Sequence, residues 1–256
     1  MPYVEQLGSR LYFEVHGKGP PLVLLHGVGG NHASWFNQVA VWRDRFQLIL
    51  IDARGFGKSN DAELEGRSRF TDDLLAVLGQ LQLHRVSIVA QSMGAGTAID
   101  FTCRFPERVV SVVIADSLVG LTLPDSLALR MKDVLNKTAD LSQAERVLGR
   151  THLARAPAMT TLYLQIAGFN RYTVKTLVGQ QPAHTLQKLA ATGVRIAFVV
   201  GTEDVLFPED VVAEVCACIP GATLINLPGA GHSAYFEDPD AFNTRVGAWL
   251  QEGSNK

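Results

Sequence analysis

The sequence has few cysteines, little net charge and no long apolar run, and each shortage excludes a class of protein. Its three cysteines, Cys103, Cys216 and Cys218, are an odd number without metal-like spacing to histidine, which indicates free thiols in a reducing compartment. The formal net charge is −2 and no run of lysine or arginine occurs, so neither a nucleic acid nor an anionic membrane is expected as a partner.

No stretch reaches the roughly 20 apolar residues that a membrane helix needs, and the first residues lack the apolar core of a signal peptide. The sequence therefore predicts a cytoplasmic protein whose partner is a small, largely uncharged molecule, and it is compatible with a homo-oligomer. No cofactor is expected, because the glycine-rich segments around Gly27, Gly55 and Gly94 are incomplete as phosphate or dinucleotide motifs.

What is present is a regular alternation of apolar strands and amphipathic helices along 256 residues, 47% of which are apolar. The predicted strands are Leu11–His16, Leu22–Leu25, Phe46–Ile51, Val86–Ala90, Val109–Ala115, Val194–Val200 and Ala222–Leu227. The predicted helices between them are Phe70–Gln82, Met93–Phe105, Pro208–Ile219 and Pro239–Leu250. This order predicts an α/β fold with a mostly parallel sheet covered by helices on both faces, after an antiparallel start from the first two strands.

The alternation breaks once, between residues 118 and 187, where no β-rich run is evident. Short helices are expected there instead, at Ser126–Asn136, Gln143–Ala154, Ala158–Ala167 and Tyr172–Val178. We interpret 118–187 as a helical cap inserted into a core domain made of 1–117 and 188–256.

The strand Val86–Ala90 runs through Gln91 directly into Ser92 and a helix that begins with small residues. A serine at such a sharp strand-to-helix turn projects its hydroxyl above the sheet, and it needs tiny neighbours two positions before and after it. Ala90 and Gly94 occupy those positions, with alanine in place of the usual glycine. An ordinary helix-capping serine is the simpler reading, but the context favours a nucleophile.

A serine hydroxyl needs a base whose pKa lies near the working pH, and histidine meets that requirement. His232 follows the last strand in the glycine-rich loop Gly229–His232, at the sheet edge where Ser92 is expected. Other histidines lie at strand ends, at helix ends or in the cap, where structural roles are expected: His16, His84, His152 and His184.

The histidine in turn needs a carboxylate that fixes its tautomer. Asp204 fits, because it follows the strand Val194–Val200 on a strand-end loop. Glu203 beside it and Asp116, which ends the strand after the serine, remain alternatives.

Backbone amides that stabilise a developing oxyanion are expected from the loop His26–Asn31, whose glycines allow close approach to a ligand. We assign this role to the N–H groups of Val28 and Met93, and we expect His26 to shape the loop rather than to act as a second base.

Together these motifs resemble the α/β-hydrolase superfamily over essentially the whole chain, and in particular its small carboxylesterases and 3-oxoadipate enol-lactonase-like enzymes. The matching segments are His26–Gly27, Asp52–Ser59, Ala90–Gly94, Gly201–Asp204 and Gly231–His232. The resemblance implies the α/β-hydrolase fold, a triad of Ser92, Asp204 and His232, whose chain order is that of the family, and a turn at Asp52–Ser59. No metal site is expected, because no cluster of ligand residues accompanies Cys216 and Cys218.

The function expected from these residues is hydrolysis of a carboxylic ester or lactone of a small, largely apolar substrate through an acyl-enzyme on Ser92. The alternatives are a carbon–carbon bond hydrolase of the meta-cleavage type and a butenolide-type ligand receptor with slow hydrolysis; perhydrolase activity could accompany the first. Apolar residues of the cap and core are expected to line the substrate pocket: Trp35, Leu121, Leu127, Met131, Leu162, Ile166, Phe169, Leu206 and Tyr235.

Overall fold

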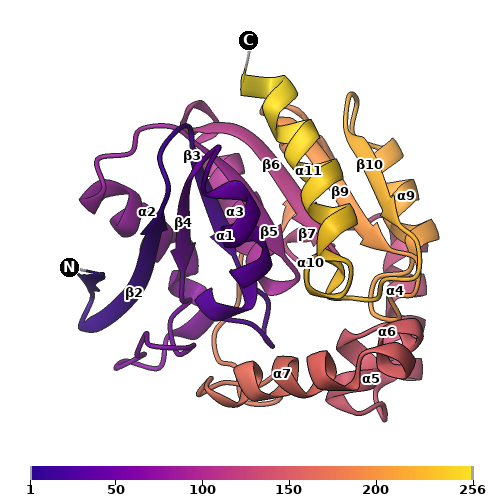
Figure 1. Cartoon of the computed structure of the whole chain (residues 1–256). Coiled ribbons are helices and arrows are strands. Elements are labelled where there is room, and N and C mark those ends of the chain that lie inside the picture. The colour runs from indigo at the N-terminus through magenta and orange to yellow at the C-terminus, as the bar shows by residue number, and fades with distance from the viewer. Residues whose placement is uncertain (1, 255–256) are drawn as a thin grey trace.

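An eight-stranded sheet runs through the computed structural model, which describes residues 2–254 (Figure 1). Its strands lie in the order β1-β2-β4-β3-β5-β6-β9-β10. Their bounds are β1 Tyr3–Gln6, β2 Ser9–His16, β3 Pro21–Leu25, β4 Gln47–Ile51, β5 Val86–Gln91, β6 Val109–Ala115, β9 Arg195–Gly201 and β10 Thr223–Leu227. All pairs from β4 to β10 are parallel, so the carboxyl ends of these strands meet at one edge.

The antiparallel part of the sheet differs from the prediction. The strands that run antiparallel are β1 and β2, with β2 also pairing β4, whereas Leu22–Leu25 lies in β3, parallel between β4 and β5. The sequence pattern missed β1, which is joined to β2 by a tight turn whose two residues, Leu7 and Gly8, both have positive φ. Such a turn matches the twist of a hairpin and is hard to recognise without a glycine or asparagine pair.

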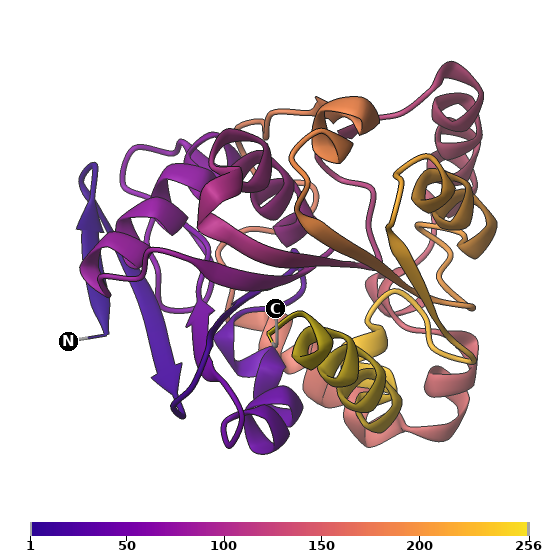
Figure 2. The ribbon, with the colours of Figure 1, turned by 90° about the horizontal axis from the view of Figure 1, so that it is seen from above.

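Helices cover both faces of the sheet, as predicted (Figure 2). On one face α2 (Phe70–Gln80), α3 (Met93–Arg104) and α9 (Glu209–Ala217) pack over a core that includes Ile88 and Ala90 of β5. On the other face α1 (Phe36–Trp42) and α11 (Pro239–Ser254) pack over a second core that includes Val89. Alternate residues of β5 thus point into opposite cores, which makes this strand a rigid support for Ser92.

Short helices that the sequence pattern did not reveal are α1, α8 (Leu186–Ala190) and α10 (Ala234–Glu237), with 3-10 turns at His32–Trp35, Gly66–Arg69 and Pro106–Arg108. No helix among residues 2–254 combines the length and the apolar character that a membrane crossing requires.

Between β6 and α8 lie the helices expected for the cap, with changes. They are α4 (Asp125–Thr138), α5 (Gln143–Val147), α6 (Arg150–Arg155) and α7 (Pro157–Gly168), and α5 to α7 lie together below the sheet in Figure 1. The segment is not free of strands, because β7 (Leu121–Thr122) and β8 (His184–Thr185) form a short parallel pair at its entry and exit. Two-residue strands carry too little pattern to be predicted.

Two of the predicted cap helices differ from the structure, one in its extent and the other in being no helix. Gln143–Ala154 is divided into α5 and α6 at Leu148 and Gly149, where the Gly149 N–H donates to the Glu237 carboxylate of the core. Tyr172–Val178 is a turn-rich segment rather than a helix. Tyr172 is buried there and its hydroxyl donates to Asp61 at 2.8 Å, so contacts with the core determine this conformation.

Candidate active site

Ser92 lies at the turn between β5 and α3, with φ 49° and ψ −117°. A positive φ is uncommon for a residue other than glycine and is a recurrent mark of functional turns. The Ser92 N–H donates to Ala115 O at 3.0 Å, which ties the turn to the end of β6. The sharp turn also brings Gly94 so close to β3 that a Cβ there would lie 2.5 Å from Leu25 O.

Gly94→Ala is therefore expected to destabilise the protein by about 1–3 kcal/mol, because the added methyl overpacks against backbone that cannot yield easily. The matched control is Gly79→Ala in α2, where a Cβ meets nothing within 4 Å. That change should be neutral or stabilise by up to about 1 kcal/mol through helix propensity. Urea unfolding of both variants measures the difference; equal free energies of unfolding would contradict the tight fit at Gly94.

His232 joins Ser92 to Asp204 in a continuous hydrogen-bonded chain. Its Nε2 lies 2.9 Å from Ser92 Oγ and its Nδ1 lies 3.0 Å from Asp204 Oδ2. An Nδ1 proton donated to the carboxylate leaves Nε2 as the acceptor of the serine proton, which is the arrangement of a general base. His232 and Asp204 are only 4% and 6% exposed, so water competes little for these bonds.

The Asp204 carboxylate is held by its own loop. Its Oδ1 accepts the N–H groups of Leu206 and Phe207 at 2.7 and 3.1 Å, which leaves Oδ2 for the histidine. The Phe207 ring stacks on the His232 ring with centroids 5.6 Å apart. These contacts fix both partners of the pair before any substrate binds.

The two alternative acids have other partners. Glu203 accepts the N–H and the hydroxyl of Thr151 at 2.8 and 2.7 Å, and so links the core to α6. Asp116 is fully buried and accepts the N–H groups of Gly201 and Ala234 at 2.9 and 3.2 Å. Burial, together with the nearby charge of Asp204, raises the pKa of Asp116. Asp116 thus holds together the loops that carry Asp204 and His232 without contacting the imidazole.

Glu237 makes a second link between the cap and the histidine loop. Its Oε2 accepts the N–H groups of Gly149 and Gly231 at 2.8 and 2.9 Å, and its Oε1 accepts that of Ser233 at 3.0 Å. Burial raises the pKa of Glu237 to about 7, although the three donors favour the ionised form. No motif in the sequence marks Glu237, because a lone glutamate carries no pattern that reveals its backbone partners.

This raised pKa predicts a pH-dependent stability. The folded state holds the Glu237 proton more tightly than the unfolded state, whose pKa is near 4.5, so stability is lost as the pH rises from 4.5 to about 7. The loss attributable to Glu237 is up to about 3 kcal/mol. Urea unfolding at pH 5 and pH 8 of the wild type and Glu237→Gln should show this loss in the wild type alone; parallel profiles would contradict the shift.

The N–H groups of Val28 and Met93, which are predicted to face an oxyanion, have no hydrogen-bond acceptor among the described residues. The Val28 N–H donates to no group in the described part of the chain, and Val28 lines the same cavity as Ser92. Met93 is the first residue of α3, so its N–H has no acceptor within the helix. Both groups therefore fit the donor role predicted for them.

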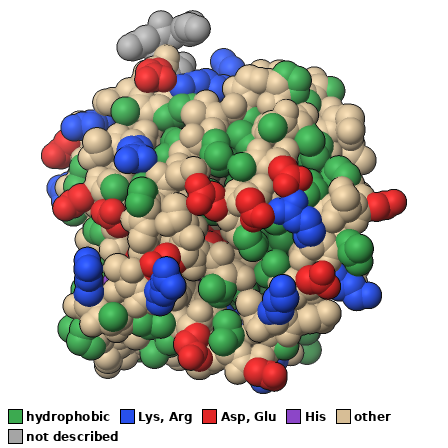
Figure 3. Space-filling view, turned by 90° about the vertical axis from the view of Figure 1, so that its right-hand side faces the viewer, with side chains coloured by type: hydrophobic (Ala, Val, Ile, Leu, Met, Phe, Trp, Pro, Cys, Tyr) green, Lys and Arg blue, Asp and Glu red, His purple; other side chains and the backbone are tan. Residues whose placement is uncertain are grey.

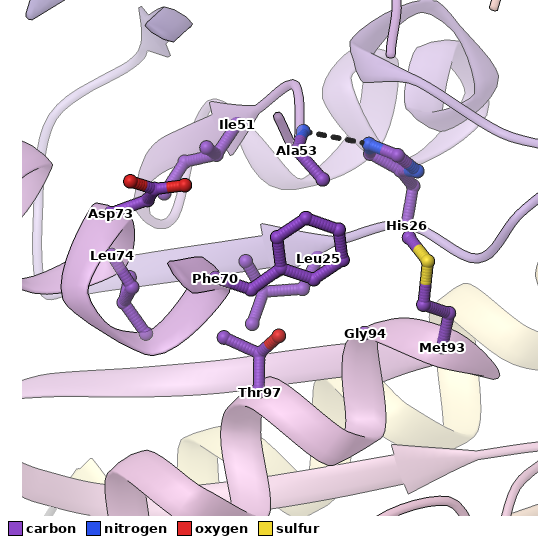
Figure 4. Close-up of a pocket in the computed structure, with 10 residues that line it drawn as sticks. All are labelled: Leu25, His26, Ile51, Ala53, Phe70, Asp73, Leu74, Met93, Gly94 and Thr97. Carbon is purple, nitrogen blue, oxygen red and sulfur yellow. Dashed lines mark hydrogen bonds between the residues drawn. The ribbon is translucent and has the colours of Figure 1, made fainter. Parts of the chain in front are cut away.

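His26 has the structural surroundings expected of a loop-shaping residue. Its Nδ1 lies 2.7 Å from Gly27 O. Its Nε2 accepts the Ala53 N–H at 3.0 Å, the bond drawn in Figure 4. Burial lowers the pKa of His26, which favours the neutral ring. The cavity beside it is about 20 Å³, roughly the room of one water molecule, so it cannot hold a substrate.

The predicted turn at Asp52–Ser59 is confirmed. The Asp52 carboxylate accepts the N–H groups of His32 and Lys58, and the Ser59 hydroxyl donates to Asp52 O. Of the other histidines, His16 and His184 each contact a carboxylate, Glu14 and Asp100 respectively, in agreement with structural roles. Residues 2–254 include no group of three potential ligands that could hold a metal ion.

Ser92 and His232 open into a cavity of about 660 Å³ between the sheet edge and the cap, which is large enough for a drug-sized ligand. Gln91 and Leu206 line it from the core, and Tyr163, Leu164 and Asn170 line it from the cap segment.

The predicted pocket residues are mostly wrong. Of the nine, only Leu206 lines this cavity in the described part of the chain. The remainder pack into the two cores or face solvent: Trp35, Leu121, Leu127, Ile166 and Tyr235 are buried in the cores, Met131 and Leu162 pack against them, and Phe169 is 75% exposed. On α7 the cavity face is one residue away from the predicted one, at Tyr163 and Leu164 instead of Leu162.

Comparison with known proteins agrees with this architecture. A protein of Mycobacterium tuberculosis that is named as a non-heme bromoperoxidase is 27% identical, over 93% of this chain and 96% of its own. A thermophilic esterase from Thermogutta terrifontis superimposes with a TM-score of 0.80 at 20% identity, covering 98% of this chain and 97% of the esterase. The enol-lactonase from Burkholderia xenovorans superimposes with a TM-score of 0.78 at 21% identity, covering 98% of this chain and all of its own.

The last two likenesses show the fold alone. Residues 20–239 match the α/β hydrolase fold family. The chain therefore belongs to the α/β-hydrolase family, and its membership of that family identifies it as a hydrolase.

Proposed function

We propose that this protein hydrolyses carboxylic esters or lactones through an acyl-enzyme on Ser92. The observation that carries the proposal is the unbroken chain from Asp204 through His232 to Ser92, which ends at the wall of a 660 Å³ cavity. A nucleophile, a base and an orienting acid in this order are the parts that acyl transfer requires.

In the first half of the reaction, His232 Nε2 takes the hydroxyl proton of Ser92 as Oγ attacks the substrate carbonyl. The negative charge that develops on the carbonyl oxygen faces the N–H groups of Val28 and Met93. The imidazolium then gives its proton to the leaving alkoxide, and Asp204 remains ionised throughout.

In the second half, His232 activates a water molecule, which attacks the acyl group on Ser92 and releases the acid. A lactone follows the same course, except that its leaving alkoxide stays attached to the acyl group. The names of the two structural neighbours, an esterase and an enol-lactonase, support these two substrate classes.

The bromoperoxidase name of the M. tuberculosis relative favours one second candidate. Perhydrolysis would use the same acyl-enzyme with hydrogen peroxide in place of water, so it would accompany ester hydrolysis rather than replace it. The cysteines Cys103, Cys216 and Cys218 are all free thiols, which supports a reducing, cytoplasmic setting for either reaction.

Steady-state hydrolysis of p-nitrophenyl esters from acetate to octanoate tests the proposal, with Ser92→Ala as the blank. Many turnovers per second with at least one ester are expected, and the preferred chain length reports the size of the acyl site. Negligible hydrolysis by folded wild type would contradict the proposal and favour a carbon–carbon hydrolase; tight retention of a butenolide with slow turnover would favour a receptor.

A further inference from the structure

Among the described residues, the formally charged side chains that line the active-site cavity are all positive. Its lining includes the cations Arg146 and Lys175, both from the cap segment, and no aspartate or glutamate among the described residues. The one carboxylate of the triad, Asp204, lies behind His232 and is not part of the wall. A ligand in this cavity therefore meets an excess of positive charge.

Arg146 lies in α5 and is partly buried. Its Nε is buried and has no hydrogen-bond partner, and its guanidinium makes no ion pair with any described residue. The neighbouring Glu145 does not compensate it, because that carboxylate accepts the N–H of Ser142 in the capping box of the same helix.

Other arginines of the cap segment are satisfied. Arg130 pairs with Asp210 and Glu214 of α9, and Arg150 pairs with Glu203. Arg171 donates to Asp61 O. Arg155 also lacks a partner among the described residues but is exposed to water, so Arg146 is the one arginine of the described cap segment with a buried donor that has no acceptor.

Leaving the buried Nε–H of Arg146 without an acceptor is costly, because this donor loses water and gains nothing in return. An anionic group of the substrate would supply the missing acceptor. Lys175 is exposed at the margin of the cavity, where its charge would attract an anion toward the opening.

We propose that the substrate carries an ionised carboxylate, remote from the scissile carbonyl, which Arg146 binds and Lys175 attracts. This inference rests on the proposed function and replaces its largely uncharged substrate with an anionic one. A carboxylate is the anion proposed, because its two oxygens match one planar guanidinium, and a phosphate is the competing outcome of the test below.

Matched ester pairs test the proposal in turnover. On the acyl side, mono(p-nitrophenyl) pimelate is compared with p-nitrophenyl heptanoate; on the alcohol side, p-carboxyphenyl acetate is compared with phenyl acetate. For at least one pair, the wild type is expected to prefer the anionic ester by about ten- to a hundredfold in kcat/KM. Arg146→Gln should reduce that preference to near unity.

The matched control is Arg155→Gln, which removes the same charge from an exposed position in α6 outside the cavity. It should keep the preference of the wild type. Equal kcat/KM for both members of both pairs, with Ser92-dependent turnover intact, would overturn the carboxylate site and leave the proposed function standing.

A binding measurement covers the case in which no ester is turned over. Calorimetric titration of the Ser92→Ala variant with heptanoate is compared with titration of a Ser92→Ala, Arg146→Gln double variant. Binding about tenfold weaker or more in the double variant supports the site even if the protein is no esterase. Equal affinities, or tighter binding of heptyl phosphate than of heptanoate, would overturn it.

Discussion

Ser92→Ala is expected to lower kcat for ester hydrolysis by roughly four to six orders of magnitude. The loss is large because Ser92 Oγ is the only described nucleophile that contacts His232 Nε2, at 2.9 Å, so no neighbouring group can replace it in forming the acyl-enzyme. What remains would come from the oxyanion donors and from binding alone. Steady-state rates with the preferred p-nitrophenyl ester measure the change.

Ser111→Ala is the matched control, because it removes a buried hydroxyl on β6 that bonds Ser87 away from the cavity. It should keep kcat within a few-fold. If Ser92→Ala retained a substantial rate while its circular dichroism matched that of the wild type, another residue would be the nucleophile.

Asp204→Asn is expected to lower kcat by roughly three to four orders of magnitude with little change in fold. An amide nitrogen in place of Oδ2 would meet His232 Nδ1 as a donor, and would favour the tautomer in which Nε2 carries the proton. That tautomer cannot accept the proton of Ser92. The N–H groups of Leu206 and Phe207 keep their acceptor at Oδ1, so the loop should hold.

The Asp116→Asn variant distinguishes the role of Asp116 from that of Asp204. Asp116 contacts Gly201 and Ala234 but not His232, so its loss should loosen the loops and lower the melting temperature more than it lowers kcat. The pair of variants should therefore differ by at least about tenfold in kcat. An inactive Asp116→Asn variant beside an active Asp204→Asn variant would transfer the role of the acid to Asp116.

Much of the fold could be predicted from the sequence, because its strongest signals are local. The strand β5 is continuously apolar and ends in Ser92, and only a sharp turn reconciles that strand with the small residues that follow it. Asp204 and His232 each follow a strand that pairs in parallel, so the topology alone brings them to the edge where Ser92 lies. The hydrogen-bonded geometry that was predicted for the triad is present.

The cavity wall could not be predicted in the same way, because an apolar residue of the cap serves equally well to pack or to line a pocket. On α7, Leu162 packs against the core without lining the cavity, whereas its neighbour Tyr163 belongs to the same core and also lines the cavity. Likewise, the sequence does not show that Arg146 lacks a partner whereas Arg130 has two. These distinctions depend on contacts between segments far apart in the chain.

The outer face seen in Figure 3 shows no comparable excess of positive charge. On the face seen in Figure 3, acidic and basic side chains are interspersed among apolar ones. The face therefore resembles the surface of an ordinary globular protein, and the one-sided charge of the cavity stands out against it.

The most direct test of the central claim is to label the protein with a fluorophosphonate and locate the adduct by peptide mass spectrometry. A single adduct on Ser92 is expected, because the reagent reacts with a serine that an adjacent base activates. Labelling should be slowed by orders of magnitude in His232→Gln. An adduct on another residue, or an unlabelled Ser92 in a protein that still hydrolyses esters, would contradict the account.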